Sequence, residues 1–402
     1  MTKKKIIILI SSALGLILIG VILSFVLADK GEKKEGSEDE GFFSSFFGSG
    51  SSPAVVSPVD PLENIEQKYE TTTQQEKDLV HLTNFAVAGA IFNEELEKII
   101  YFEKATGHLY KIDPSGQNRE QISITTIPGL FEIIWSPDGT KAVLRYFDIN
   151  SDTIKENVYS FSVSSFATST EGVFLPINTT SISSSPNNDK IFYLVGENET
   201  KGIISSFENK NQKEIFSLFF GEFLTNWPQT NSITLLTKPS YSTEGYFYKL
   251  NATNGSLTKL IGDKKGLTAV LSPSTNKILY SQSADNSIET KIYDTDKSDS
   301  VYFDKTTLPE KCLFSKIDNS VIYCAVPREI LSAKYPDDWY KGLISFSDTI
   351  WKIDIDSGIN ELILNEEDLD AINMSSGKEE NFLIFQNKKD GTLWSLKLES
   401  KD

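Results

Sequence analysis

The chain of 402 residues carries 56 Asp and Glu against 39 Lys and Arg, which gives a formal net charge of −17. This acidic balance argues against a nucleic-acid-binding protein, because contacts to phosphates require a basic surface. With only two His and two Cys in the sequence, a multi-ligand zinc site or an iron–sulfur cluster is nearly excluded, and we expect no metal and no cofactor.

The N-terminal residues predict a membrane anchor. Residues 1–5 contain three Lys and form a cytoplasmic tail in this interpretation, and residues 6–28 contain no charged residue. As a helix, that apolar segment would be roughly 35 Å long, which is enough to cross the hydrocarbon layer. Because the Lys residues precede it, the positive-inside rule keeps the N-terminus in the cytoplasm. We therefore predict a single-pass protein of the cytoplasmic membrane whose remaining residues are extracytoplasmic.

A cleaved signal peptide is the alternative to this anchor, because Val26-Leu27-Ala28 is an acceptable cleavage site. The apolar run exceeds the roughly 7–15 residues of a signal-peptide core, which favours the uncleaved anchor. Residues 29–77 follow as a flexible tether, first charged and then rich in Gly, Ser and Pro. Four Phe in it either contact the membrane surface or a partner, or cover a patch on the chain's own globular part. These are Phe42, Phe43, Phe46 and Phe47.

A repeat of about 45 residues begins near residue 78 and predicts the fold. Each copy contains a turn followed by an apolar run, and then a strand, a polar turn and a further strand, which makes four short strands. The apolar runs occupy consecutive positions, so both faces of each sheet must be covered. We predict an all-β fold over residues 78–402, a seven-bladed β-propeller with four-stranded antiparallel blades. The seven copies begin with residues 92–102, 135–147, 184–195, 227–237, 271–281, 314–324 and 374–385.

The last copy ends after its third strand, and its missing strand is expected at the other end of the propeller. Residues 77–82 resemble the strands that close other copies, such as residues 257–261. We predict that this N-terminal strand completes the last blade, which would pair the two ends of the propeller and leave no open edge there.

Sequence motifs in the repeats point to a family. The stretch WSPDGTKAVL at 135–144 and the Ser-Pro turns at 185–189 and 272–276 resemble the repeats of the TolB-like, or WD40-like, bacterial propellers. Only the first of these stretches keeps the full WSPDG pattern. The resemblance implies an exported propeller, and the layout of anchor, tether and propeller is similar to membrane-anchored propeller proteins of uncultured bacteria.

Two cysteines bracket one predicted hairpin. Cys312 and Cys324 lie at equal distance from Asp318, so they are candidates for directly opposed positions on paired strands. An extracytoplasmic compartment permits a disulfide between them. Two buried thiols are the alternative, because cross-strand geometry is often poor for the bond.

Motifs for catalysis are missing from the sequence. It has no G-x-S-x-G, H-E-x-x-H, P-loop or G-x-G-x-x-G pattern. The acidic stretches at 294–299 and 354–358 lack the glycine and distal glutamate of an EF-hand calcium loop and coincide with the turn of the repeat, so turn chemistry explains them, with weak calcium binding as the alternative. We therefore expect a protein that is not an enzyme.

The longest departure from the repeat is an insertion in the sixth copy, Pro327 to Asp348. It connects a second strand to a third, on the face of a propeller that also carries the links between blades. Long loops in compact domains are usually functional, and aromatic residues with Arg are typical of interface hot spots. We predict a partner-binding loop, with a brace folded over its own blade by Tyr335, Trp339 and Tyr340 as the alternative. The candidate contact residues are Arg328, Tyr335, Asp337, Asp338, Trp339 and Tyr340.

Together these features predict a non-enzymatic, membrane-anchored scaffold in the cell envelope, whose propeller binds an envelope protein or peptide. A sensor that binds a small ligand or a glycan at the mouth of the propeller channel is the alternative. An envelope hydrolase or lyase is disfavoured, because clustered His and acidic residues are not found.

Overall fold

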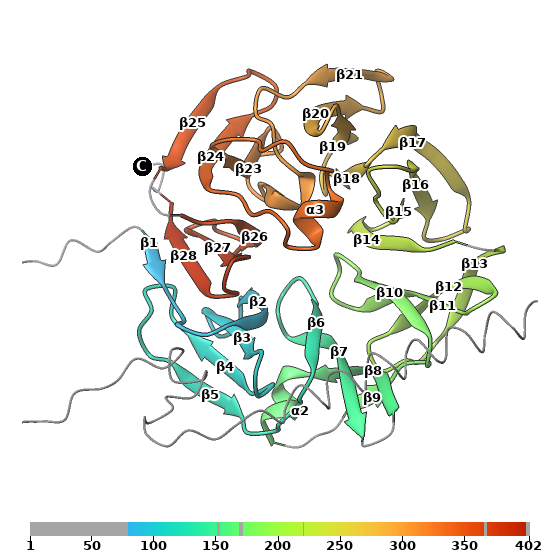
Figure 1. The fold of residues 1–402 in the computed structure, drawn as a ribbon. Helices are drawn as coiled ribbons and strands as arrows, with labels where there is room; N and C mark the ends of the chain where they lie inside the picture. Colours follow the sequence, from blue (N-terminus) through green and yellow to red (C-terminus); the bar gives the residue numbers. More distant parts are fainter. Residues whose placement is uncertain (1–78, 151–152, 169–171, 220, 366–367, 399–402) are drawn as a thin grey trace, which may run out of the picture. The chain divides into compact units, whose positions relative to one another are not determined.

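The computed structural model describes residues 79–150, 153–168, 172–219, 221–365 and 368–398. These residues form seven four-stranded antiparallel sheets arranged in a ring, which confirms the predicted seven-bladed propeller (Figure 1). The predicted membrane anchor at 6–28 and the tether at 29–77 lie outside the described residues. Within the described part of the chain, no helix has the length and apolar character needed to span a membrane.

The first three blades follow each other along the chain. Blade 1 consists of β2 (Val87–Asn93), β3 (Lys98–Glu103), β4 (Leu109–Ile112) and β5 (Glu120–Ser123). Blade 2 consists of β6 (Leu130–Trp135), β7 (Lys141–Asn150), β8 (Thr153–Ser162) and β9 (Gly172–Phe174), with the short helix α2 (Val163–Thr168) between β8 and β9. Blade 3 consists of β10 (Thr179–Ser184), β11 (Lys190–Val195), β12 (Glu199–Ser206) and β13 (Lys213–Phe219).

The next three blades repeat the same order. Blade 4 consists of β14 (Phe223–Gln229), β15 (Ser232–Thr237), β16 (Glu244–Asn251) and β17 (Leu257–Lys265). Blade 5 consists of β18 (Thr268–Leu271), β19 (Lys277–Ala284), β20 (Ser287–Asp294) and β21 (Asp299–Tyr302), and the 3-10 helix η1 (Pro309–Lys311) leads to blade 6. Blade 6 consists of β22 (Cys312–Phe314), β23 (Val321–Pro327), β24 (Asp348–Asp354) and β25 (Asn360–Leu364), with α3 (Asp337–Tyr340) between β23 and β24.

Blade 7 is assembled from both ends of the described chain. It consists of β26 (Ala371–Ser376), β27 (Phe382–Asn387), β28 (Leu393–Lys397) and, as its outer strand, β1 (Leu79–His81). β1 pairs antiparallel with β28, so that Leu79 lies opposite Leu396 and His81 lies opposite Trp394. The rings of His81 and Trp394 stack with their centroids 4.2 Å apart. The N-terminal strand therefore completes the last blade, as the sequence predicts.

Buried serines explain why the Ser-Pro repeat forms its hairpins. Ser136, Ser185 and Ser272 each follow the inner strand of a blade and are almost fully buried. The Ser136 hydroxyl accepts a hydrogen bond from the Lys141 N–H at 2.9 Å, and the Ser185 hydroxyl accepts one from the Lys190 N–H at 3.1 Å. A short hydroxyl side chain satisfies backbone groups that the tight turn leaves unpaired. The motif is thus structural in this chain.

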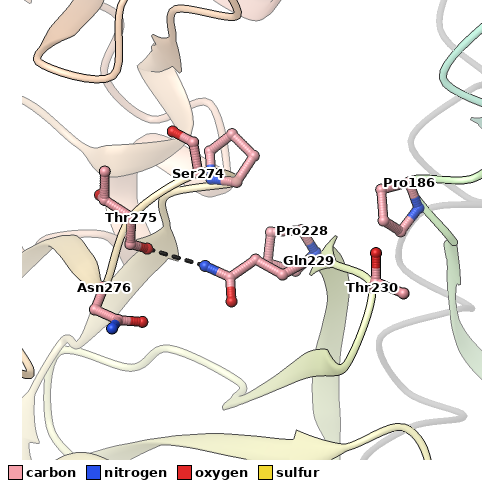
Figure 2. Close-up of a pocket in the computed structure, with 8 residues that line it drawn as sticks. Pro186, Pro228, Gln229, Thr230, Ser274, Thr275 and Asn276 are labelled. Atoms are coloured by element: carbon pink, nitrogen blue, oxygen red, sulfur yellow. Dashed lines mark hydrogen bonds between the residues drawn. The ribbon is translucent and has the colours of Figure 1, made fainter.

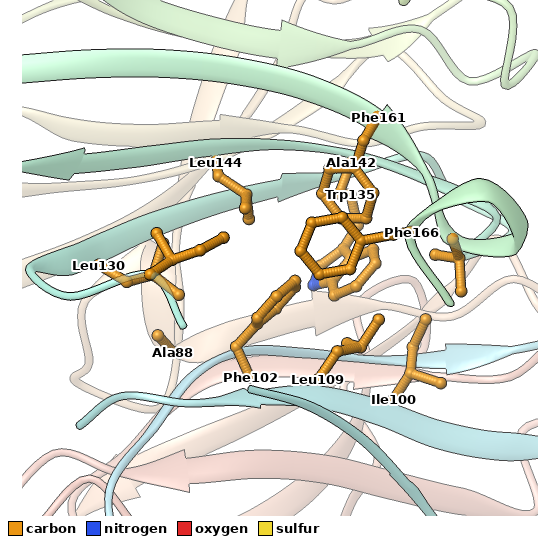
Figure 3. Packing of buried hydrophobic residues seen from close by; sticks show 12 residues of the cluster. Ala88, Ile100, Phe102, Leu109, Leu130, Trp135, Ala142, Leu144, Phe161 and Phe166 are labelled. Carbon is orange, nitrogen blue, oxygen red and sulfur yellow. The ribbon is translucent and has the colours of Figure 1, made fainter. Parts of the chain in front are cut away.

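The core consists of apolar layers between neighbouring blades. Between blades 1 and 2, Phe102 packs edge-on against Phe161 with ring centroids 6.1 Å apart, and Trp135 lies 5.9 Å from the same Phe102 ring (Figure 3). Phe166 of α2 packs in the same cluster, with its ring centroid 6.0 Å from that of Phe102. Each blade is therefore covered on both faces, which is why consecutive residues of the second strands are apolar.

Candidate functional site: the face that carries the insertion

The two faces of the propeller differ in what they carry. Strands alternate in direction within a blade, so the links between blades and the connections from second to third strands lie on one face. We call this the linker face. The hairpin turns between first and second strands lie on the opposite face, which we call the turn face. The insertion connects β23 to β24 and therefore lies on the linker face.

The insertion reaches beyond its own blade. The Ala333 N–H donates to the Asn286 carbonyl of blade 5 at 2.9 Å, and the Ser283 hydroxyl of the same blade donates to the Tyr335 carbonyl. The Tyr241 N–H of blade 4 donates to Asp337 Oδ2 at 2.6 Å. On the other side, Lys388 Nζ of blade 7 donates to the Trp339 carbonyl at 2.7 Å. The insertion thus ties together blades 4 to 7.

Two of the six predicted contact residues are core side chains. Tyr335 is 1% exposed and Trp339 is 3% exposed, and both rings stack on Phe346, at centroid distances of 5.9 Å. Leu308 and Ile288 complete this apolar cluster. Because side chains buried in this way have no surface to offer a partner, Tyr335 and Trp339 fit the brace interpretation and not the binding one.

A buried ion cluster lies beneath the insertion. Lys311 Nζ donates to Asp348 Oδ2 at 2.8 Å and to Asp370 Oδ1 at 2.5 Å, and all three side chains are almost completely buried. The other Asp370 oxygen accepts hydrogen bonds from Trp339 Nε1 at 2.9 Å and from the Phe346 N–H at 3.0 Å. The cluster therefore holds η1, the insertion and the start of blade 7 in one arrangement.

The electrostatic balance of this cluster is uneven, with two carboxylates around one ammonium. Burial raises the pKa of Asp348 above its ordinary value, the Lys311 ammonium partly offsets that rise, and the Asp370 carboxylate adds to it. Asp348 Oδ1 has no hydrogen-bond partner among the described residues. Because the folded-state pKa exceeds the unfolded-state value, the contribution of Asp348 to stability is greatest at low pH and declines as the pH rises through the folded-state pKa.

The four other predicted contact residues are also used within the chain. Arg328 Nη1 donates to Asn365 Oδ1 at 2.6 Å, and Asp338 Oδ2 accepts from the Lys334 N–H at 2.8 Å. The Tyr340 hydroxyl donates to Glu310, and Asp337 accepts the bond from blade 4. These bonds leave parts of the side chains exposed, but their observed role is to shape the loop. Sequence reasoning missed Lys311 and Asp370, because single charged residues next to apolar strands carry no distinctive pattern.

The remaining part of the linker face exposes apolar side chains. Phe131 and Phe147 stack on each other with ring centroids 4.6 Å apart, and the Arg145 guanidinium lies 5.3 Å from the Phe131 ring. Phe131 and Phe147 are in contact, and Phe174 and Ile177 line one groove, so we take the exposed apolar side chains of this part of the face as the main candidate surface. We call it the apolar linker surface. It comprises Ile124, Phe131, Phe147, Phe174, Ile177, Phe219 and Leu224 of blades 2 to 4 and their links.

On the turn face, a hollow of about 350 Å³ opens between the first hairpin turns of blades 3, 4 and 5 (Figure 2). Pro186, Pro228 and Thr230 line one side of it. The side-chain amide of Gln229, which also lines the hollow, donates hydrogen bonds to the carbonyls of Ser272 and Thr275 at 2.9 Å each. Both amide hydrogens are therefore used within the chain. The predicted alternative, a small-ligand or glycan sensor at the mouth of the propeller channel, stays a prediction. Among the described residues, no group of three or more His, Cys, Asp or Glu could hold a metal ion.

The two cysteines lie on paired strands of blade 6. Cys312 of β22 is directly opposite Cys324 of β23, and the structure joins them in a disulfide with Cα atoms 4.1 Å apart. Cys324 is fully buried. The bond therefore closes the hairpin that begins just after η1 and the buried Lys311.

We expect the purified protein to contain this disulfide, and its removal to be destabilising. A Cys312→Ala, Cys324→Ala variant should lose about 2–4 kcal/mol of unfolding free energy, because the open hairpin gains conformational freedom in the unfolded chain. Urea denaturation measures this loss. The wild-type protein treated with a reductant serves as a control and should show a similar loss. An intact-protein mass that does not change on reduction of the unfolded chain would show that the bond is not formed.

No protein-family model and no curated protein sequence matches the chain. Solved structures similar to it include an oligogalacturonate lyase in complex with manganese, at 9% identity, with a TM-score of 0.54 and coverage of 80% of this chain and 93% of the other. The propeller domain of the trilobed protease from Pyrococcus furiosus is 14% identical, with a TM-score of 0.53 and coverage of 79% and 96%. TolB from Acinetobacter baumannii is 14% identical, with a TM-score of 0.42 and coverage of 79% and 64%.

The first two likenesses support the propeller fold and no particular activity. The Pyrococcus propeller domain has an open velcro topology, whereas in this chain β1 pairs with β28. The predicted similarity to membrane-anchored propellers of uncultured bacteria stays a prediction. By fold, then, the chain is a seven-bladed β-propeller.

Proposed function

We propose that this chain is a non-enzymatic scaffold of the cell envelope, which binds a protein or peptide through the linker face of its propeller. In this proposal residues 6–28 hold the protein in the cytoplasmic membrane, and residues 29–77 place the propeller outside it. The observation that carries the proposal is the apolar linker surface. Ile177 and Phe219 within it are 65% and 78% exposed, and such residues gathered on one face of a water-soluble domain favour a binding partner.

The brace on the other part of the linker face supports the same function. The insertion and its ion cluster tie blades 4 to 7 together, so the face is held in one shape before any partner arrives. A preorganised surface binds more tightly, because less conformational entropy is lost on binding. In this proposal the insertion contributes rigidity, and blades 2 to 4 contribute the contacts.

The proposal is tested by chemical crosslinking in membranes, followed by purification of the tagged full-length chain and mass spectrometry. The test variant carries Phe174→Asp, Ile177→Asp and Phe219→Asp on the linker face. Wild type should recover one or more envelope proteins, and this variant should lose them, because a charge cannot be buried against an apolar partner without a large desolvation cost.

A matched variant controls for general effects of the new charges. It carries Leu96→Asp, Ile317→Asp and Ile359→Asp, which are exposed apolar residues of the turn face, and Ile317 at 64% exposure closely matches Ile177. This control should keep the crosslinked partners. Recovery of the same partners with the linker-face variant would refute the proposed surface, and recovery of none with wild type would refute the scaffold function.

A further inference from the structure

The outer edge of β8 in blade 2 is only partly covered by its neighbouring strand. β8 pairs with β7 along its whole length, from Thr153 to Ser162. β9 pairs only with Tyr159, Ser160 and Phe161, and the Leu175 N–H adds one bond to the Val158 carbonyl at 2.9 Å. From Thr153 to Asn157, β8 therefore has β7 as its only strand partner among the described residues.

Blade 5 also has a short outer strand, but there the chain that follows it covers the rest of the neighbouring strand. Its outer strand β21 pairs only with Lys291 to Asp294 of β20. The chain beyond β21 then continues along β20, because the Phe303 N–H donates to the Thr290 carbonyl at 3.2 Å and the Thr307 N–H donates to the Thr290 hydroxyl at 3.0 Å. In blade 2 the last backbone hydrogen bond to β8 comes from the Leu175 N–H, and residues 176–179 lie beside β8 without a strand pairing to it.

Residues Thr153–Asn157 of β8, which we call the open edge, have backbone groups that could pair with another strand. The Val158 carbonyl points outward, since it accepts the bond from Leu175. Backbone groups alternate in direction along a strand, so the N–H and carbonyl of Glu156 point outward as well. Those of Lys155 and Asn157 point toward β7. A strand laid beside β8 could therefore pair with Glu156 and extend the four-stranded sheet by one short strand.

A groove of about 370 Å³ runs beside this edge, lined by residues 155–158 of β8 and by residues 174–179. Phe174 and Ile177 on its far wall are 57% and 65% exposed, and both belong to the apolar linker surface. Side chains of an added strand alternate between its two faces. Every second residue of that strand would consequently lie near this apolar wall.

The charged side chains at the groove determine which kind of strand could pair with the open edge. Lys155 is exposed at the groove, and Glu156 is already paired with Arg145, whose Nη2 lies 2.6 Å from Glu156 Oε1. If two copies of this chain paired antiparallel through the open edge, the register that overlaps residues 153–157 completely would place Lys155 opposite Lys155. Like charges directly opposite each other are destabilising. An acidic residue from a different chain would instead complement Lys155.

We propose that the open edge of β8 binds an extended segment of another protein by strand addition, with apolar residues at alternate positions and an acidic residue opposite Lys155. This inference rests on the proposed scaffold function and gives it a specific site. Backbone pairing with β8 supplies the affinity, and the groove with its Lys155 supplies the preference for sequence.

The test uses short random peptides displayed on phage and selected against the full-length chain in detergent. Selected peptides should alternate apolar residues and carry an acidic residue, and their synthetic versions should bind wild type. Glu156→Pro removes the outward N–H but no bond to β7, and should weaken binding about tenfold. The matched Glu156→Gln variant keeps that N–H and should bind within about twofold of wild type. Lys155→Glu should weaken binding about fivefold.

Amide hydrogen exchange supplies a readout specific to strand pairing. On binding of a selected peptide, the exchange of the Glu156 amide should slow, whereas a contact made only by side chains would leave it unchanged. If Glu156→Pro does not fold, Ile177→Asp takes its place, with Ile317→Asp on the turn face as its control.

Unchanged affinity of the selected peptides for Glu156→Pro, or unchanged exchange at Glu156, would overturn strand addition. Failure to select any peptide would overturn it as well. Neither result decides the scaffold function, because the crosslinking experiment tests that function without peptides.

Discussion

Replacement of Lys311 by Met should lower the free energy of unfolding by about 3–5 kcal/mol. The substitution leaves the carboxylates of Asp348 and Asp370 buried without the ammonium that lies 2.8 Å and 2.5 Å from them. An uncompensated charge in the interior is far more costly than a lost surface contact. Urea denaturation followed by tryptophan fluorescence would measure the loss, and Trp339 is a suitable reporter because its indole N–H bonds to Asp370.

A surface pair in the same region provides the control. Lys389 Nζ lies 2.5 Å from Asp368 Oδ1, but the Asp368 side chain is 77% exposed. Lys389→Met should therefore cost no more than about 1 kcal/mol. Equal effects of the two substitutions would show that the Lys311 cluster is not the brace that we describe. Asp370→Asn should fall between them, because the amide keeps part of the hydrogen bonding and removes one of the two negative charges.

Deletion of residues 79–84 should open the ring and destabilise the propeller by about 5 kcal/mol or more. The deletion removes β1 and with it the ladder to residues 394–396. It also removes Leu82, which is buried in the apolar layer between blades 7 and 1, and the bond from the Leu393 N–H to the Thr83 hydroxyl at 3.0 Å. The thermal unfolding midpoint, measured by circular dichroism, should drop sharply, and β28 would become an exposed edge.

The control deletes the same number of residues from the predicted tether, at 66–71, and should leave the melting temperature unchanged. A synthetic peptide with the sequence of residues 77–86 should restore part of the lost stability when added to the deletion variant, because it can pair with β28 in place of β1. An unchanged melting temperature after deletion of 79–84 would mean that the closing pair contributes nothing to the stability of the ring.

The architecture was predictable because it repeats. Each copy encodes its strands locally, through a polar turn, which is Ser-Pro in three copies, and a run of apolar residues such as those at 190–195. Seven copies of a sheet with two apolar faces can bury those faces only against each other, and a ring leaves none uncovered. The incomplete last copy likewise predicts where the N-terminal strand must lie.

The insertion was not predictable in the same way. Its composition is compatible with a binding loop and with a brace, since aromatic side chains stabilise both. Only the position of Trp339 over Phe346 and Asp370 shows that the loop turns inward. Asp370 is far from Lys311 in the sequence, and no motif connects them. Their contact depends on how η1 and the link between blades 6 and 7 meet on the linker face.

The amino-acid sequence by itself determined the number of blades, the strands within them and the pairing of the two ends, because these follow from local turns and repeated apolar runs. The tertiary structure decided which residues of the linker face are buried and which remain available. That division depends on the reach of a single loop across four blades and on the shortness of β9 beside β8, and both are relations between segments that no local pattern encodes.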